Sequence, residues 1–126
     1  KFRENFRPFA PATLTEFSND IFEMPINRKV NFMERVYSIK KKWRSKIPAV
    51  THIDGSGRIQ TVSKETNNRF YKIIKEFYNL TGVPVVLNTS FNLNGEPVVM
   101  TPEDAIRTFY TCGLDILVLN DYIIYK

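Results

Sequence analysis

Apolar side chains recur with the period of a helix in the second half of the chain. Over residues 66–80 they are spaced three and four apart, which gives an amphipathic helix one apolar face: Phe70, Ile73, Ile74, Phe77 and Tyr78. Gly82 can adopt the left-handed conformation that ends this helix. A second helix is predicted from the capping residue Thr101, followed by Pro102 and two acids, to Gly113.

Short apolar runs rich in β-branched residues predict buried strands around these helices. The runs cover residues 83–87 and 116–119, and Asn120-Asp121 can turn the chain into a return strand over 122–125. The segment 88–97 is polar and is predicted to be a loop.

The first half of the chain has a less regular pattern, which predicts shorter elements. They are an extended segment at 6–11, a short helix at 12–22 and strands at 30–33 and 36–39. A β-hairpin is predicted from two strands, 47–53 and 58–62, joined by Asp54-Gly55-Ser56-Gly57. Because helices and hairpins mix along the chain, the sequence predicts an α/β or α+β fold with a mixed, twisted sheet.

Length and composition indicate one globular domain over residues 1–126. The chain is 43% hydrophobic and 13% aromatic, which excludes a disordered protein. No apolar run approaches the ~20 residues of a membrane span, and the first residues carry no apolar signal core. Cys112, the only cysteine, excludes an internal disulfide and fits the reducing cytoplasm, where we expect the protein.

Positive charge is concentrated in the first half. The formal net charge is +5, since 18 Lys and Arg outnumber 13 Asp and Glu. Residues 1–63 carry a net +6 and residues 64–126 a net −1. A basic half points to an anionic partner, which could be nucleic acid, a phosphorylated small molecule or an acidic protein surface.

Three cations near the start of the chain form the first candidate site. In an extended segment Lys1, Arg3 and Arg7 share one face, because strand side chains alternate. Arginine can bind phosphate oxygens through two parallel hydrogen bonds, and lysine acts as a point charge. The segment is therefore either an anion site or a basic edge strand that faces solvent.

The predicted hairpin carries the second candidate site. His52 and Asp54 share one face of it, as do Arg58 and Gln60. A lone histidine is more often a hydrogen-bonded structural residue than a catalyst. One His with one Asp is too few for a metal site, so no zinc or iron site is expected.

A polar stretch directly after the predicted strand 83–87 forms the third candidate. Asn88, Ser90 and Asn92 offer amides and a hydroxyl at a strand end, where open α/β sheets bind ligands. The alternative is a loop of local side-chain turns. Ser90 is not expected to be a covalent nucleophile, because no Gly-x-Ser-x-Gly elbow surrounds it.

A basic run with one aromatic residue covers residues 40–46. It either binds nucleic acid through phosphate contacts and stacking or is a solvated segment anchored by Trp43 in the core, and we favour the second. Neither Gly-x-Gly-x-x-Gly nor the phosphate-loop motif is present, so the common nucleotide-binding folds receive no support.

Four ordered segments together resemble one family, the C-terminal domain of the NodU/TobZ/CmcH O-carbamoyltransferases. They are distributed along the chain from its first residue to position 119, at residues 1–12, 47–62, 82–97 and 101–119. The resemblance implies a YrdC-like fold, a twisted mixed sheet flanked by helices. It also implies that the chain is a fragment of a two-domain protein, in which a larger actin-like ATPase-type domain precedes it.

The resemblance further implies a two-step reaction. The YrdC-like domain would bind carbamoyl phosphate and ATP with Mg²⁺ and form carbamoyl adenylate. The N-terminal domain, which would hold the family's catalytic metal, would then move the carbamoyl group to a substrate hydroxyl. The family's Lys-x-Arg…Ser-x-Asn signature is matched by the residues expected to be catalytic, Lys1, Arg3, Ser90 and Asn92. The residues expected to hold carbamoyl phosphate are Lys1, Arg7, Met33, Arg58 and Ser90, with His52, Gln60 and Asn88 as possible additions.

Two other functions would use the same features. A YrdC-like enzyme of tRNA modification would form threonylcarbamoyl adenylate with the same signature, and an RNA-binding module would use the basic first half. The His-x-Asp-Gly segment at 52–55 and the polar stretch 88–92 favour the carbamoyltransferases. Nucleic acid and membrane partners are therefore not expected.

Overall fold

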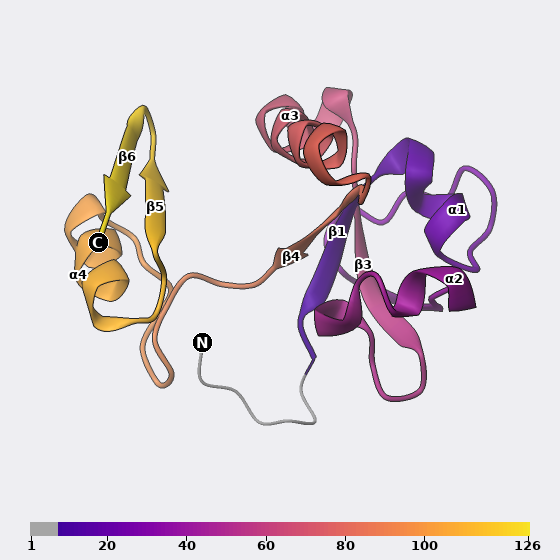
Figure 1. Ribbon diagram of the computed structural model, residues 1–126, viewed down its shortest axis with the longest axis horizontal. Helices are drawn as coiled ribbons and strands as arrows, with labels where there is room; N and C mark the ends of the chain where they lie inside the picture. Colours follow the sequence, from indigo (N-terminus) through magenta and orange to yellow (C-terminus); the bar gives the residue numbers. More distant parts are fainter. Residues whose placement is uncertain (1–7) are drawn as a thin grey trace. The chain divides into compact units, whose positions relative to one another are not determined.

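The computed structural model describes residues 8–126, which divide into two units, Pro8–Thr89 and Ser90–Lys126 (Figure 1). The first unit contains the strands β1 (Ala10–Leu14), β2 (Arg35–Ser38), β3 (Ser56–Val62) and β4 (Val85–Asn88) and the helices α1 (Ser18–Ile21), α2 (Lys41–Arg44) and α3 (Lys64–Thr81). The second contains α4 (Pro102–Thr111), β5 (Ile116–Leu119) and β6 (Tyr122–Tyr125). The expected mixture of helices and strands is confirmed, whereas the interpretation of residues 1–126 as one domain stays a prediction.

The first unit is built on a mixed four-stranded sheet in the order β2-β3-β1-β4. Strand β1 runs parallel to β3 and antiparallel to β4, and β2 runs antiparallel to β3. Helix α3 covers one face through a core of Ala12, Leu14, Val62, Tyr71 and Ile74. The short helices α1 and α2 lie on the other side of β1 and β3 (Figure 1), over a second core that includes Ile21, Phe22, Ile39, Trp43 and Ile59.

Helix α3 confirms the longest predicted helix and shows why it begins and ends where it does. The Ser63 hydroxyl caps its first turn by accepting a hydrogen bond from the Thr66 N–H. Gly82 ends it with a φ of 71°, the left-handed conformation that glycine adopts without steric cost. The apolar spacing read from the sequence places Ile74 in the core beneath the helix.

The predicted helix at 12–22 is wrong for most of its length. Residues 10–14 form β1, and only Ser18–Ile21 are α-helical, after a 3-10 turn at Thr15–Phe17. All five residues of β1 are buried, since the strand is covered on both faces. The alternation that would reveal a strand is therefore missing from this segment.

The predicted hairpin is also wrong, because β3 pairs with β2 and not with residues 47–53. Pro48–Val50 form a 3-10 turn, in which the N–H groups of Val50 and Thr51 bond to local carbonyls instead of a neighbouring strand. Residues 30–33 are not a strand either. Val30 bonds through its N–H to the Thr61 hydroxyl, and its carbonyl accepts from the Thr61 N–H.

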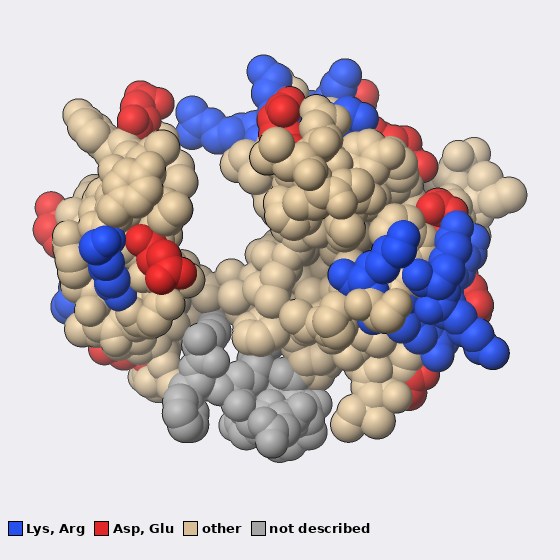
Figure 2. Space-filling model, viewed as in Figure 1, with Lys and Arg blue, Asp and Glu red and all other residues tan. Residues whose placement is uncertain are grey.

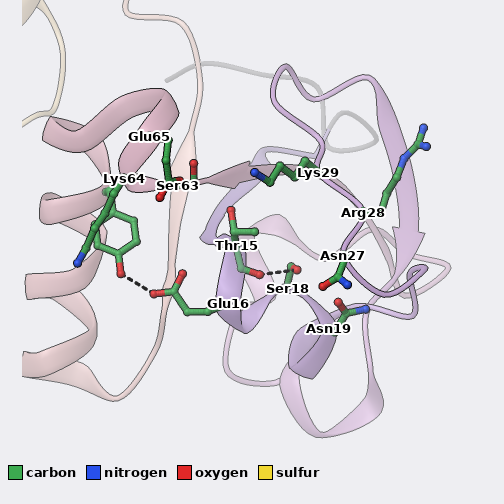
Figure 3. Close-up of a pocket in the computed structure, with 11 residues that line it drawn as sticks. Thr15, Glu16, Ser18, Asn19, Asn27, Arg28, Lys29, Ser63, Lys64 and Glu65 are labelled. Carbon is green, nitrogen blue, oxygen red and sulfur yellow. Dashed lines mark hydrogen bonds between the residues drawn. The ribbon is translucent and has the colours of Figure 1, made fainter.

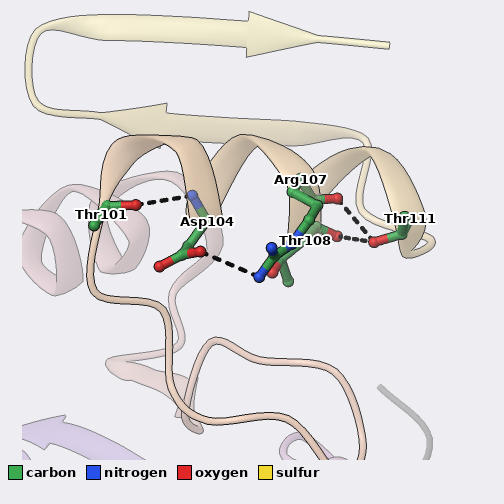
Figure 4. A network of polar contacts seen from close by, with 5 residues as sticks. All are labelled: Thr101, Asp104, Arg107, Thr108 and Thr111. Carbon is green, nitrogen blue, oxygen red and sulfur yellow. Dashed lines mark hydrogen bonds and ion pairs between the residues drawn. The ribbon is translucent and has the colours of Figure 1, made fainter.

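The second unit confirms the elements predicted for its sequence. Thr101 caps α4 by accepting from the Asp104 N–H at 3.1 Å, and Asp104 forms an ion pair with Arg107 (Figure 4). Phe109 packs with Leu117 of β5 in a small core. The helix ends at Thr111, two residues before the predicted Gly113. In the described part of the chain, no helix is long and apolar enough to cross a membrane.

Replacing Phe22 by alanine should lower the free energy of unfolding by about 3–5 kcal/mol, because the cavity left in the core relaxes only partly. Phe22 is 1% exposed, whereas Phe32 is 83% exposed. Urea denaturation of both variants measures the difference. The control variant Phe32→Ala should change stability by less than about 0.5 kcal/mol, and equal losses in the two variants would contradict this core.

The Thr101 cap should contribute about 1 kcal/mol to the stability of the second unit. Thr101→Ala removes the oxygen that accepts from the Asp104 N–H, while Thr101→Ser keeps it. Amide hydrogen exchange in the first turn of α4 should therefore accelerate in the alanine variant and stay close to wild type in the serine variant. A similar rate in both variants would show that the cap does not stabilise this helix.

Candidate functional site

Arg58 presents an exposed cation on the sheet of the first unit. It lies in β3 opposite Val36 of β2, and its side chain is exposed while its neighbours Gly57 and Ile59 are buried. Within residues 8–126, no carboxylate forms an ion pair with Arg58 and no hydrogen-bond acceptor engages it. The guanidinium is therefore available to an anion.

Two amide side chains meet on the same face of the sheet. Gln60 stands two residues after Arg58 on β3, and its Oε1 accepts from Asn88 Nδ2 at 2.7 Å. Strand β1 lies between them and contributes only small side chains there, because Ala12 is the register partner of Gln60 and Ala10 that of Asn88. The structure thus brings together Arg58, Gln60 and Asn88, three of the residues predicted for the site.

Gln60 also fixes the loop that carries Met33. Its Nε2 donates to the backbone carbonyl of Asn31 at 2.9 Å. Met33, two residues further on, has a φ of 58°, a left-handed conformation that costs a non-glycine residue about 1–2 kcal/mol. Such strain persists only where the surrounding structure holds it, and it is common beside functional sites.

The contribution of Asn31 was missed in the sequence, because a backbone carbonyl carries no residue signal. Of the two alanines under the amide pair, Ala12 fell in the segment predicted to be a helix, whereas Ala10 fell in the predicted extended segment 6–11. The small residues flanking Pro11 are the signal that could have shown a strand approached closely by its neighbours' side chains.

His52 and Asp54 are brought together by Ser56 and not by a shared strand face. The Ser56 hydroxyl donates to Asp54 Oδ1 at 2.7 Å and lies 3.1 Å from His52 Nδ1. Since the serine proton goes to Asp54, His52 must donate through Nδ1 to the serine oxygen. The hydrogen bonds from the Ser56 side chain and backbone lower the pKa of Asp54. This arrangement stabilises the turn before β3.

Ser90 and Asn92 contact each other in the second unit. The Ser90 hydroxyl donates to Asn92 Oδ1 at 2.7 Å, and Asn92 Nδ2 donates to the carbonyls of Leu93 and Glu96. This half of the expected catalytic signature is held in one loop. The other half, Lys1 and Arg3, lies outside the described residues together with Arg7, so the signature stays a prediction.

The basic run at 40–46 is largely used within the fold. Lys40 donates to the Asn19 carbonyl, Lys42 forms an ion pair with Asp20 at 2.6 Å, and Arg44 donates to the Ile39 carbonyl. Trp43 is 7% exposed, which confirms that it anchors this run in the core. Figure 2 shows Lys and Arg gathered on the first unit where Figure 1 draws α2. These contacts support the structural interpretation of the run.

Comparison with known proteins gives the family. The family model described as "Carbamoyltransferase C-terminus" matches residues 1–126. The chain belongs to this family. Nodulation protein NolNO of Sinorhizobium fredii is 46% identical over the whole of this chain, which covers 19% of that protein. Nodulation protein NolO of Bradyrhizobium diazoefficiens is 42% identical over the whole of this chain, which covers 23% of that protein. Nodulation protein U of Rhizobium tropici is 41% identical over 75% of this chain, and the match covers 16% of that protein.

The match to the carbamoyltransferase C-terminus family confirms the resemblance read from the four sequence segments. The chain spans about a fifth of the length of these relatives. The family therefore identifies a part of each relative, and the activity of a whole protein is a separate question.

This carbamoyltransferase C-terminal chain also has a polar pocket that the sequence did not predict. The cavity, of about 430 Å³, lies in the first unit beside the first turn of α3, and none of the described candidate residues lines it (Figure 3). In it, the Tyr71 hydroxyl donates to Glu16 Oε1 at 2.5 Å. This hydrogen bond, together with burial, raises the pKa of Tyr71 to about 12.

The raised pKa of Tyr71 predicts a loss of stability at high pH. The folded value of about 12 exceeds the unfolded value of about 10, so the stabilisation is complete below pH ~10 and is lost as the pH rises through ~12. The free energy of unfolding should fall more steeply over this range in the wild type than in Tyr71→Phe. Glu16→Gln should bring the phenolate transition, followed by ultraviolet difference titration, closer to pH ~10. A Tyr71 transition near pH ~10 in the folded wild type would contradict the proposed cause.

Proposed function

We propose that this chain binds carbamoyl phosphate and ATP and forms carbamoyl adenylate. An N-terminal domain of the same protein would then transfer the carbamoyl group to a substrate hydroxyl. The observation that carries the proposal is the match of all 126 residues to the carbamoyltransferase C-terminus family. It supports a role for the chain in an O-carbamoyltransferase, and Arg58 with its neighbours supplies chemistry suited to the smaller substrate.

Carbamoyl phosphate combines a dianionic phosphate with a flat group that carries both hydrogen-bond donors and an acceptor. Among residues 8–126 no group engages the guanidinium of Arg58, and a guanidinium fits phosphate oxygens with two parallel hydrogen bonds. Gln60 and Asn88 place amides on the same sheet face. The face therefore offers a cation for the phosphate and polar atoms for the carbamoyl group.

The reaction balances when one water is consumed: carbamoyl phosphate and ATP give carbamoyl adenylate, inorganic phosphate and pyrophosphate. Charge on the phosphates must be stabilised throughout, and positioned cations do this without a general base. We assign this role to Arg58 together with Lys1, Arg3 and Arg7. Ser90 and Asn92 would orient the substrates through hydrogen bonds.

Magnesium would enter this site with ATP. Among residues 8–126 there is no group of three His, Cys, Asp or Glu residues that could hold a metal ion. Mg²⁺ commonly keeps several waters and binds through substrate phosphates, so the residues present fit an ion carried by the nucleotide. The proposal places the protein in the cytoplasm, where ATP is supplied.

Arg58→Ala should weaken carbamoyl phosphate binding by about 10- to 100-fold, which corresponds to the loss of one charge-assisted phosphate contact. Isothermal titration calorimetry on the intact protein measures the affinity. Arg35→Ala is the matched control, because Arg35 is also exposed but stands opposite Ile59, so its side chain leaves the other face of the sheet. Its affinity should equal that of the wild type. Unchanged affinity in Arg58→Ala would remove Arg58 from the site, and absence of carbamoyl phosphate binding in the wild type would overturn the proposed function.

A further inference from the structure

The amide of Asn88 has a defined orientation, which follows from the chain of hydrogen bonds through Gln60. The backbone carbonyl of Asn31 can only accept, so the group of Gln60 that faces it must be the NH₂ group. Gln60 therefore turns its oxygen toward Asn88. An oxygen only accepts, so Asn88 must donate to it through its own NH₂ group. Asn88 Oδ1 is left as the acceptor of the pair.

Asn88 Oδ1 is held ready for a ligand that donates hydrogen bonds. No donor within the described part of the chain reaches it. Asn88 is half-buried and is the last residue of β4, paired in register with the buried Ala10. Its side chain is thus fixed by a strand on one side and by Gln60 on the other.

We infer that Asn88 Oδ1 accepts a hydrogen bond from the carbamoyl NH₂ group and makes the site select carbamoyl phosphate over acetyl phosphate. The inference rests on the proposed function. Acetyl phosphate has nearly the same shape and the same phosphate, but a methyl group replaces the NH₂ group. Arg58 cannot tell the two apart, since both present the same phosphate. An acceptor on the same face can, because the methyl group leaves it desolvated without a partner.

The discrimination depends on the three-residue arrangement and not on Asn88 alone. Without Gln60, the Asn88 amide could rotate and present its NH₂ group, which repels the NH₂ group of the ligand. Gln60 is therefore a positioning residue: it contacts Asn31 and Asn88 and fixes which atom of Asn88 faces the ligand.

The test compares two ligands on the intact protein by isothermal titration calorimetry. The wild type should bind carbamoyl phosphate more tightly than acetyl phosphate. Asn88→Leu should weaken carbamoyl phosphate about tenfold while changing the affinity for acetyl phosphate less than about twofold. Gln60→Met should reduce the preference in the same direction. Asn68→Leu, at an exposed position on α3, is the matched control and should leave both affinities unchanged.

The outcomes separate this inference from the function on which it rests. If the wild type binds both ligands equally, or if Asn88→Leu weakens both equally or neither, the role of Asn88 is overturned. Carbamoyl phosphate binding that still depends on Arg58 would then leave the proposed function standing. If the wild type binds no carbamoyl phosphate, both fail. Circular dichroism identifies a misfolded Asn88→Leu, in which case the wild-type preference and Gln60→Met decide.

Discussion

The pairing of β1 with both β3 and β4 is the constraint on which the rest of the first unit depends. All five residues of β1 are buried, and the strand separates one hydrophobic core from the other. Its register sets Gln60 beside Ala12 and Asn88 beside Ala10. Because β1 places only alanine methyl groups between them, Asn88 Nδ2 and Gln60 Oε1 can approach each other above the strand to 2.7 Å.

The cations of the first half fall into two groups: some form hydrogen bonds or ion pairs within the fold, and others do not. Lys42 is paired with Asp20, and Lys40 and Arg44 donate to backbone carbonyls. Arg58, on a regular strand, has no such partner among the described residues. An exposed ion pair stabilises a protein little, whereas an unpaired cation on a rigid strand can bind an anion without first breaking a contact.

The sequence predicted correctly the segments that bury one regular face and failed where apolar residues are buried without a regular period. Helices α3 and α4 each bury one face, so their period is visible in the sequence. The capping residue Thr101 also marks the start of α4, whereas α3 begins at Lys64 after its cap Ser63, two residues before the predicted start. The segment at 47–53 was wrongly predicted to be a strand because Ile47 and Val50 reach the core from a 3-10 turn. The number of apolar residues in a short segment does not distinguish such a turn from a strand. His52 and Asp54 do not share the predicted strand face, because a turn joins them through local hydrogen bonds to Ser56.

By itself, the sequence determined the family, the mixed α/β class, the helices α3 and α4 and the arginine at position 58, a residue type that commonly binds phosphate. The tertiary structure decided which polar groups meet. The bonds that orient Asn88 join residues 28 and 29 positions apart in the chain. Their formation requires the strand order β3-β1-β4 and two alanines in the middle strand. Local propensity contains no information on such contacts, because a strand's neighbours are chosen by the burial of the whole sheet.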